Sequence, residues 1–271
     1  MLIKVLVPCL DRSLDQVKEL AVFLGIEGEA VFLDQCGKDS KDSFELNGHR
    51  IEVISTRKRG VSMARNILIE NAQCDIGLFI DDDCVLTSGY LAAIEAAYQR
   101  LPSAQAIRFN TIRKYWNPVN ARAEKERKAS FSDLSSFGVW GLSFRPAALM
   151  ERNLFFDEHL AAPNYLYNGE DSIFLFDLCR KLDYVYLGTF DVCEVKETKK
   201  STWFEKFDKR YFVTKGYVYT HLYGWKWLLA IVRMYLKYHK DYQMKYKQIR
   251  QYARIGHEMY IHHQYEEPRD E

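Results

Sequence analysis

Three consecutive carboxylates, Asp81, Asp82 and Asp83, follow the apolar run 76–80 in the segment IGLFIDDDCVL. Like charges side by side repel one another, so the folded chain needs a group that holds them. A divalent cation can do this, and Mg²⁺ typically binds one or two carboxylates together with substrate phosphates. Side chains two residues apart on an extended segment point the same way, which lets Asp81 and Asp83 share one target. The alternative is a solvated acidic turn, because Asp is common in turns.

A second pair of acids, Glu170 and Asp171, follows Gly169 at the start of an apolar segment with helical spacing. Acids are favourable at a helix N-terminus, so the pair could serve only to begin the helix. The catalytic interpretation is that one carboxylate takes the proton from a hydroxyl group as that hydroxyl attacks a substrate. The residues by themselves leave both interpretations open.

The first half of the chain contains the elements that must position these acids. We predict strands over 2–7, 30–33, 50–55, 75–80 and 104–113, and helices over 13–25, 62–72 and 88–101. Strands that alternate with helices of this length predict an α/β fold with a mostly parallel central sheet and helices on both faces. Ligands bind such sheets beyond the carboxyl ends of the strands, which is where the acidic cluster falls.

The second half is less regular, with a predicted strand over 138–145, a helix over 171–182 and a strand over 183–187. From residue 201 the composition becomes basic and aromatic, with 14 Lys and Arg against three Asp and Glu between Lys199 and Gly256. We therefore predict a domain of residues 1–200 and a helical extension of residues 201–271. Lys, Arg, Trp and Tyr together favour an anionic membrane surface as the partner of this extension. The alternatives are packing of the aromatic residues onto the domain and a merely solvated charged face.

The bulk composition excludes several classes of protein. The chain has 271 residues, 48% of them hydrophobic, and a net charge of +1, which is typical of a well-filled globular core. Its six cysteines form no CxxC pair, so we expect reduced thiols and a cytoplasmic protein. No apolar stretch reaches the ~18 residues of a membrane span. Residues outside the basic segment carry an excess of acids, which argues against a dedicated nucleic-acid partner.

The stretch RGVSMARNILIENAQCDIGLFIDDDCVL resembles the nucleotide-sugar-binding half of family 2 glycosyltransferases of the bacterial type, which have the GT-A fold. The family shows Gly-x-x-x-Ala-Arg-Asn, then a helix, then a strand that ends in Asp-x-Asp. Here the matching residues are Gly60, Ala64, Arg65, Asn66, Asp81 and Asp83. The segments VLVPCLDR, FLDQ, GVWGLSFRPAAL and GEDSIF resemble further parts of the family pattern. The resemblance covers roughly residues 2–200.

The resemblance implies a role for each matching residue. Residues 1–113 would form the nucleotide-sugar-binding half and residues 114–200 the acceptor-binding half. The nucleotide sugar would be bound by Pro8, Asp34, Arg65, Asn66, Asp81 and Asp82, and the metal on its diphosphate, Mg²⁺ or Mn²⁺, by Asp83. Asp171 would be the catalytic base with Glu170 beside it, and Trp140 and Gly141 would border the acceptor. Many family members place a metal-binding His where this chain reads DVCEVKETKKSTW, so Glu197 could replace it.

The expected function is therefore that of a metal-dependent, inverting glycosyltransferase. Its donor would be a nucleotide-diphosphate sugar, with a UDP-sugar favoured and a hexose or N-acetylhexosamine transferred. Its acceptor would be a glycan or lipid-linked glycan of cell-surface polysaccharide synthesis, at the inner face of the cell membrane. Two alternatives stay open: a sugar nucleotidyltransferase, disfavoured because PCLDRSLD lacks a Gly-rich phosphate loop, and a non-catalytic carbohydrate- or membrane-binding protein. The sequence leaves the sugar, the base, the linkage and the oligomeric state open.

Overall fold

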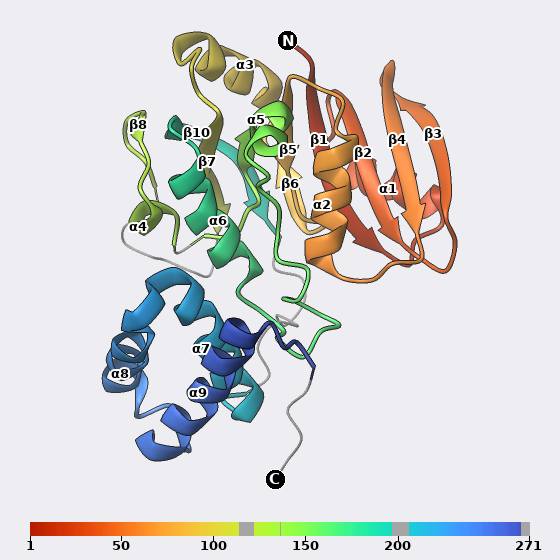
Figure 1. Cartoon of the computed structure of the whole chain (residues 1–271). Coiled ribbons are helices and arrows are strands. Elements are labelled where there is room, and N and C mark those ends of the chain that lie inside the picture. The colour runs from red at the N-terminus through yellow and green to blue at the C-terminus, as the bar shows by residue number, and fades with distance from the viewer. Residues whose placement is uncertain (114–121, 136, 197–205, 267–271) are drawn as a thin grey trace. The chain divides into compact units, whose positions relative to one another are not determined.

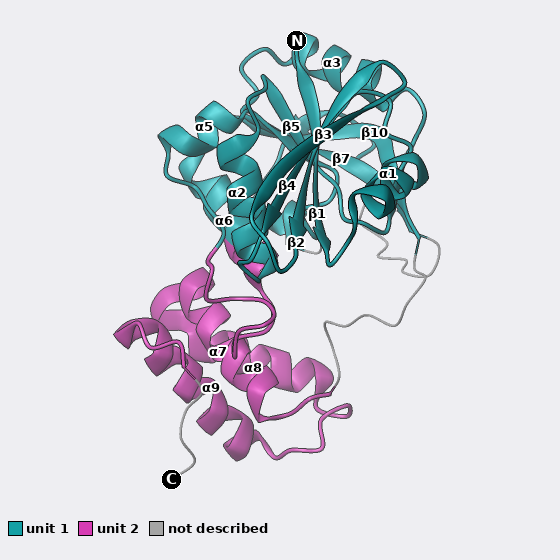
Figure 2. Ribbon diagram, turned by 90° about the vertical axis from the view of Figure 1, so that its right-hand side faces the viewer, with its two compact units in different colours: residues 1–156, 174–198 teal, residues 157–173, 199–271 magenta. Residues whose placement is uncertain are grey.

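A computed structural model of the chain describes residues 1–113, 122–135, 137–196 and 206–266 (Figure 1). The chain divides into two compact units, which are coloured separately in Figure 2. Unit 1 contains residues 1–156 and 174–198, and unit 2 contains residues 157–173 and 199–271. Residues 157–173 thus group with the C-terminal helices, whereas the sequence-based division at residue 200 stays a prediction.

Unit 1 is built on one mixed sheet that contains ten strands in the described part of the chain. The strands are β1 Ile3–Leu10, β2 Glu29–Gln35, β3 Ser40–Leu46, β4 His49–Thr56, β5 Ile76–Phe79, β6 Cys84–Leu86, β7 Ala106–Arg113, β8 Arg127–Lys128, β9 Leu142–Phe144 and β10 Val185–Val195. Their order is β3-β4-β2-β1-β5-β9-β7-β10-β6, and β8 pairs with β10. The sheet is parallel through β4-β2-β1-β5 and between β7 and β10, and antiparallel at its other pairs.

Helices cover both faces of this sheet. The helices up to the end of unit 1 are α1 Leu14–Phe23, α2 Val61–Asn71, α3 Tyr90–Arg100, α4 Phe131–Leu134, α5 Pro146–Glu151 and α6 Glu170–Lys181. One buried cluster joins α1 and α3 to the sheet, and a second joins α2, α5 and α6 to the opposite face. Successive side chains of a strand alternate between faces, so β1 gives Val5 to the first cluster and Leu6 to the second.

Most predicted elements of the first half are confirmed with shifts of one or two residues at their ends. Helix α1 begins after Ser13, whose side chain accepts a hydrogen bond from Gln16 N, while the Gln16 side chain bonds back to Ser13, as a capping box requires. Strand β3 was not predicted. It forms a hairpin with β4 through the turn residues Asn47 and Gly48, which have φ values of 52° and 80°. Strand β10 also extends eight residues beyond the predicted end at residue 187.

Unit 2 consists mainly of helices, in agreement with the predicted helical extension. They are α7 Lys209–Tyr223, the short 3₁₀ helix η1 Gly224–Lys226, α8 Trp227–Tyr238 and α9 Tyr246–His262. Helices α7 and α9 pack closely because glycines meet backbone at the crossing: a Cβ on Gly216 would lie 1.9 Å from Ala253 O, and one on Gly256 would lie 1.8 Å from Val213 O. Within the described residues, no helix has the length and apolar character needed to cross a membrane.

Candidate functional site

The acidic cluster lies at the carboxyl edge of three neighbouring parallel strands. Strands β2, β1 and β5 are adjacent in that order. Asp34 is next to the last residue of β2, and residues 81–83 follow the end of β5 at Phe79. Pro8 is buried on β1 between them, opposite Leu33 of β2. The structure therefore brings the predicted nucleotide-binding residues of three separate segments to one edge of the sheet, where α/β sheets bind ligands.

The side chain of Asp34 is buried, and only one of its two carboxylate oxygens has a hydrogen-bond partner in the described chain. The residue is 1% exposed, and its Oδ1 atom accepts a hydrogen bond of 3.1 Å from the backbone N–H of Arg12. Its Oδ2 atom has no hydrogen-bond partner among the described residues. A buried carboxylate oxygen without a donor is costly, so this atom is poised to accept a hydrogen bond from a bound molecule.

Arg12 connects Asp34 to the acidic cluster. Its backbone N–H donates to Asp34, and its Nη2 atom lies 2.8 Å from Asp82 Oδ2. Sequence reasoning missed this residue, although it lies only two positions after the first strand, in the segment VLVPCLDR. The ion pair gives Asp82 a counter-charge from within the protein, so Asp82 differs chemically from its two neighbours.

Asp81 has a guanidinium partner of its own. The Nη2 atom of Arg65 lies 3.0 Å from Asp81 Oδ1, and the Arg65 side chain is only 3% exposed. Its guanidinium carbon lies 5.4 Å from the centre of the Phe156 ring, a geometry that favours a cation–π contact. Arg65 lies in the second turn of α2, and Gly60 N, just before that helix, donates a 2.6 Å hydrogen bond to Gln35 Oε1. Arg65 and Asp81, which were both predicted to bind the nucleotide sugar, thus contact each other, and the Arg65 side chain is buried.

Asp83 differs from both neighbours because no described guanidinium or ammonium group pairs with it. Its Oδ1 atom accepts only a weak contact of 3.4 Å from the Cys84 thiol. The surrounding protein desolvates the carboxylate and thereby raises the pKa of Asp83, and the charge of Asp81 raises it further. A bound cation would relieve both effects.

The carboxylate oxygens at this edge suit a metal ion whose remaining coordination positions are filled by a bound substrate. Across the described ranges, no three His, Cys, Asp or Glu side chains gather closely enough to hold a metal ion by themselves. Mg²⁺ needs only one or two protein carboxylates when phosphate oxygens and water complete its shell. Asp83, as an oxygen donor without a cationic partner, fits that requirement. Glu197, the other predicted ligand, lies outside the described residues.

Asn66 is held by the backbone of Phe156. Its Nδ2 atom donates to Phe156 O at 3.0 Å, and its Oδ1 atom accepts from Phe156 N at 2.7 Å. These two bonds fix the segment whose aromatic ring lies beside Arg65. Asn66 therefore supports the position of Arg65, and its predicted contact with the nucleotide sugar stays a prediction.

Trp140 and Gly141 are attached directly to the end of β5. Gly141 N donates to Phe79 O at 2.8 Å, two residues before Asp81. Gly141 has φ of +78°, and an added Cβ would lie 2.9 Å from Thr111 Cγ2, so a side chain is excluded here on both counts. The Arg113 guanidinium lies 4.6 Å from the Trp140 ring, and the buried Trp140 Nε1 has no partner in the part of the chain that is described. The predicted acceptor residues thus lie in the same unit as the acidic cluster.

Gly169, Glu170 and Asp171 belong to unit 2, where α6 begins. Gly169 has φ of +100°, and its carbonyl accepts a 3.1 Å hydrogen bond from Ile173 N. Glu170 is 5% exposed, whereas Asp171 is partly exposed. The predicted pair thus occupies the first turn of a helix, and its place beside the acidic cluster stays a prediction.

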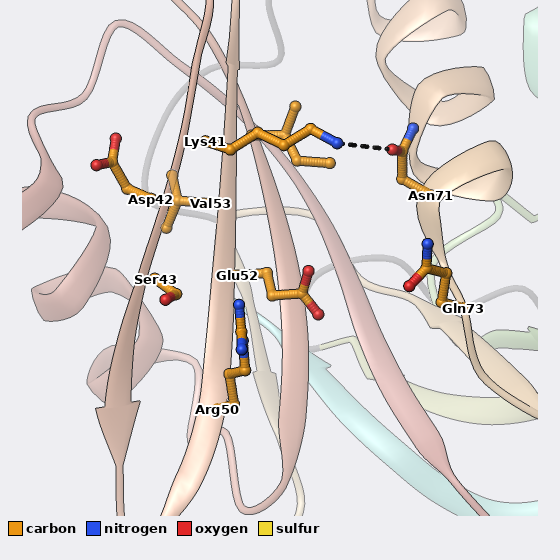
Figure 3. Close-up of a pocket in the computed structure, with 9 residues that line it drawn as sticks. Lys41, Asp42, Ser43, Arg50, Glu52, Val53, Asn71 and Gln73 are labelled. Carbon is orange, nitrogen blue, oxygen red and sulfur yellow. Dashed lines mark hydrogen bonds between the residues drawn. The ribbon is translucent and has the colours of Figure 1, made fainter.

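A surface pocket lies on another part of unit 1 and contains none of the predicted residues. Figure 3 shows it on β3 and β4 and beside the end of α2, lined by Lys41, Asp42, Ser43, Arg50, Glu52, Val53, Ile54, Asn71 and Gln73. Lys41 Nζ lies 3.5 Å from Asn71 Oδ1 across it.

The chain is similar to known glycosyltransferases in sequence and in fold. The model of the family described as Glycosyl transferase family 2 matches residues 5–155. S. aureus TarS 1–349 in complex with UDP-GlcNAc is similar in structure, with a TM-score of 0.61 and 14% identity over 82% of this chain and 66% of that chain. The mannosyltransferase PcManGT from Pyrobaculum calidifontis, in complex with GDP-Man and Mn²⁺, gives a TM-score of 0.53 and 15% identity over 96% and 69%.

At these identities the solved structures establish the fold, and this chain spans about two thirds of the length of the TarS chain. No curated protein sequence matches the chain.

Proposed function

The chain belongs to glycosyl transferase family 2, and from this premise we propose that it is a metal-dependent, inverting glycosyltransferase. It transfers a hexose or N-acetylhexosamine from a nucleotide-diphosphate sugar to a hydroxyl group. The observation that carries this proposal is that the carboxylates at the sheet edge differ in their hydrogen-bond and ion-pair partners. Among the described residues, Asp81 and Asp82 have guanidinium partners and Asp83 has none, and one buried oxygen of Asp34 has no donor.

The donor nucleotide binds at the ends of β2, β1 and β5. Asp34 Oδ2 accepts an N–H of the base, which satisfies the orphaned oxygen. Asp81, held in place by Arg65, receives the ribose hydroxyls, while Pro8 shapes the floor of the pocket. A uridine nucleotide is favoured. The TarS structure holds UDP-GlcNAc and the PcManGT structure holds GDP-Man, which supports a nucleotide sugar as ligand without choosing between the bases.

Asp83 would hold the divalent cation, Mg²⁺ or Mn²⁺, that accompanies the donor diphosphate. When bound, this cation offsets the negative charge that develops on the leaving nucleoside diphosphate. The raised pKa of Asp83 supports this role, because the carboxylate is destabilised when it is charged and alone. The PcManGT structure contains Mn²⁺, which is consistent with a cation in this fold.

Asp171 acts as the general base. It removes the proton of the acceptor hydroxyl as the hydroxyl oxygen bonds to the anomeric carbon and the bond from that carbon to the diphosphate oxygen breaks. Attack from the face opposite the leaving group inverts the anomeric configuration. Glu170 supports Asp171, and the Trp140 face, with Gly141 beside it, borders the acceptor sugar.

The acceptor is a glycan or lipid-linked glycan of cell-surface polysaccharide synthesis, and the protein works in the cytoplasm at the inner face of the membrane. The basic and aromatic composition of residues 201–256 supports a membrane partner.

The proposal is tested by incubating the chain with a panel of UDP- and GDP-sugars, with Mn²⁺ or with a chelator. We expect release of nucleoside diphosphate that needs the metal, and an inverted product anomer by NMR once an acceptor is supplied. A nucleotidyltransferase would consume or release pyrophosphate instead, and a pure binding protein would release nothing. Either of those results would contradict the proposal.

A further inference from the structure

Helix α8 has apolar side chains on two opposite faces. Ile231 and Met234 face inward and pack with Phe212 and Ile249 in the core of unit 2. On the outside, Leu229 and Leu236 are 63% and 67% exposed. The inward pair already accounts for the packing of the helix, because a surface helix needs only one apolar stripe. The outward leucines therefore require another explanation.

The outward residues form one continuous stripe. Leu229, Arg233 and Leu236 are spaced by four and three residues, which places them on one side of α8. Trp225 precedes them in η1 and is 82% exposed, the most exposed large apolar side chain of the described chain. We call these four residues, with the flanking Lys226, Lys237 and Lys240, the α8 face. Its apolar and basic side chains alternate along the stripe.

The charge of the α8 face has one sign. No Asp or Glu occurs between Lys209 and Lys240. The four basic residues of the face form no ion pair with any described residue. Lys226 lies 5.2 Å from the Trp225 ring, and Lys237 lies 4.9 Å from the Tyr238 ring. Long basic side chains beside exposed rings can keep their charged ends in water while their stems cover apolar surface.

We propose that the α8 face binds the surface of a membrane that contains anionic lipids. Trp225, Leu229 and Leu236 enter the boundary between headgroups and acyl chains, and the four basic residues contact the anionic headgroups. Exposed leucines do not suit a nucleic-acid backbone, and the uniform positive charge selects an anionic lipid surface over a neutral one. This inference names the surface and the lipid class through which the membrane contact in the proposed function would be made. It rests on that membrane contact and not on the proposed transferase activity.

The test is sedimentation of the full chain with vesicles of phosphatidylcholine alone or mixed with phosphatidylglycerol. We expect binding to the mixed vesicles, weak binding to the neutral ones, and release at high salt. Leu229→Ser with Leu236→Ser lowers the partition coefficient at least about tenfold. Lys226→Gln with Lys237→Gln lowers it about thirtyfold, since each basic residue contributes about 1 kcal/mol near such a surface.

Matched controls come from unit 1. Val22 and Phe23 on α1 are also exposed, at 65% and 48%, and Val22→Ser with Phe23→Ser leaves vesicle binding unchanged. Lys38→Gln with Lys58→Gln removes two exposed lysines of unit 1 and has a much smaller effect than the α8 pair. Circular dichroism verifies that every variant is folded.

Three results overturn the inference: no binding to mixed vesicles, wild-type binding by the leucine variant, or a leucine variant that only dissociates a dimer. If the chain has no transferase activity but still binds vesicles, the proposed function is refuted and this inference stands. If the chain is active but does not bind vesicles, this inference is refuted and the proposed function stands. Trp225→Phe adds a further readout, because it should reduce the blue shift of tryptophan fluorescence on vesicle binding by the contribution of Trp225.

Discussion

Arg65 Nη2 lies 3.0 Å from Asp81 Oδ1, and the guanidinium of Arg65 is almost completely buried beside the Phe156 ring. Arg12 makes a corresponding contact of 2.8 Å with Asp82. Two of the three consecutive carboxylates are therefore neutralised from within the protein, and Asp83 has no cationic partner among the described residues. This division of partners supports separate tasks for three residues that look identical in the sequence.

Arg65→Lys should destabilise the chain and weaken nucleotide binding. A lysine lacks the planar fork that pairs with a carboxylate while it stacks on a ring. We expect a loss of about 1–2 kcal/mol in the free energy of unfolding, measured by urea denaturation. Arg59→Lys is the control, because Arg59 pairs with Asp11 at an exposed position and exposed pairs contribute little. Equal losses in the two variants would refute the special role of Arg65.

Asp34→Asn should weaken nucleotide binding while it leaves the fold intact. Asn keeps an oxygen for the Arg12 N–H but places an NH₂ group where the unpartnered Oδ2 lies, and this donor would face the N–H of the base. We expect a loss of about tenfold to hundredfold in affinity by calorimetry, the usual effect of one hydrogen bond to a charged group. Asp39→Asn, at an exposed position, should change nothing. Unchanged affinity in Asp34→Asn would exclude this residue from the base site.

Asp83→Asn should raise the melting temperature at pH 7 by about 1–2 °C. The pKa of Asp83 in the folded chain lies above its ordinary value of 3.8. Between those two values the folded state binds more protons than the unfolded state, so stability falls as the pH rises through that window. The gain in Asp83→Asn is therefore complete above the raised pKa and shrinks as the pH falls towards 4.

Asp82→Asn is the matched control for this measurement. It breaks the ion pair with Arg12 and should not raise the melting temperature at any pH. The electrostatic interpretation of the cluster would fail if both substitutions shifted the melting temperature in the same direction.

Asp171→Asn should lower kcat by about 10²–10⁴-fold, the usual contribution of a general base, and should leave donor affinity unchanged. Asp177→Asn, at a position further along α6, is the control and should keep most of the activity. Steady-state kinetics with donor and acceptor distinguish the two. An active Asp171→Asn enzyme would remove this residue from the mechanism.

The sequence predicts the strand ends better than it predicts the contacts made there. The buried strand and its acidic end placed Asp81 at the carboxyl edge of the sheet, and the family resemblance added Asp34, which lies at the same edge because parallel strands share it. The partnership of Arg12 with Asp82 joins residues 70 positions apart, and no local pattern selects one arginine for it. Asn66 is similar: its bonds to Phe156 span 90 positions and depend on how α2 packs.

Strand β3 was missed for a different reason. Its side chains are partly or fully exposed, so it lacks the apolar run that marks a buried strand. The sequence does contain one feature that indicates this hairpin, the pair Asn47-Gly48. Such a pair is typical of a two-residue hairpin turn, in which both residues take positive φ. Exposed edge strands are therefore better predicted from turn residues than from hydrophobicity.

The most direct test of the central claim is calorimetric titration of UDP into the wild-type chain and into Asp83→Asn, with Mn²⁺ and with a chelator. If Asp83 holds a cation on the diphosphate, Mn²⁺ will tighten binding at least about tenfold in the wild type and have almost no effect in the variant. GDP is titrated in parallel in case the base is guanine. Metal-independent binding in the wild type, or an equal metal effect in both proteins, would contradict the account.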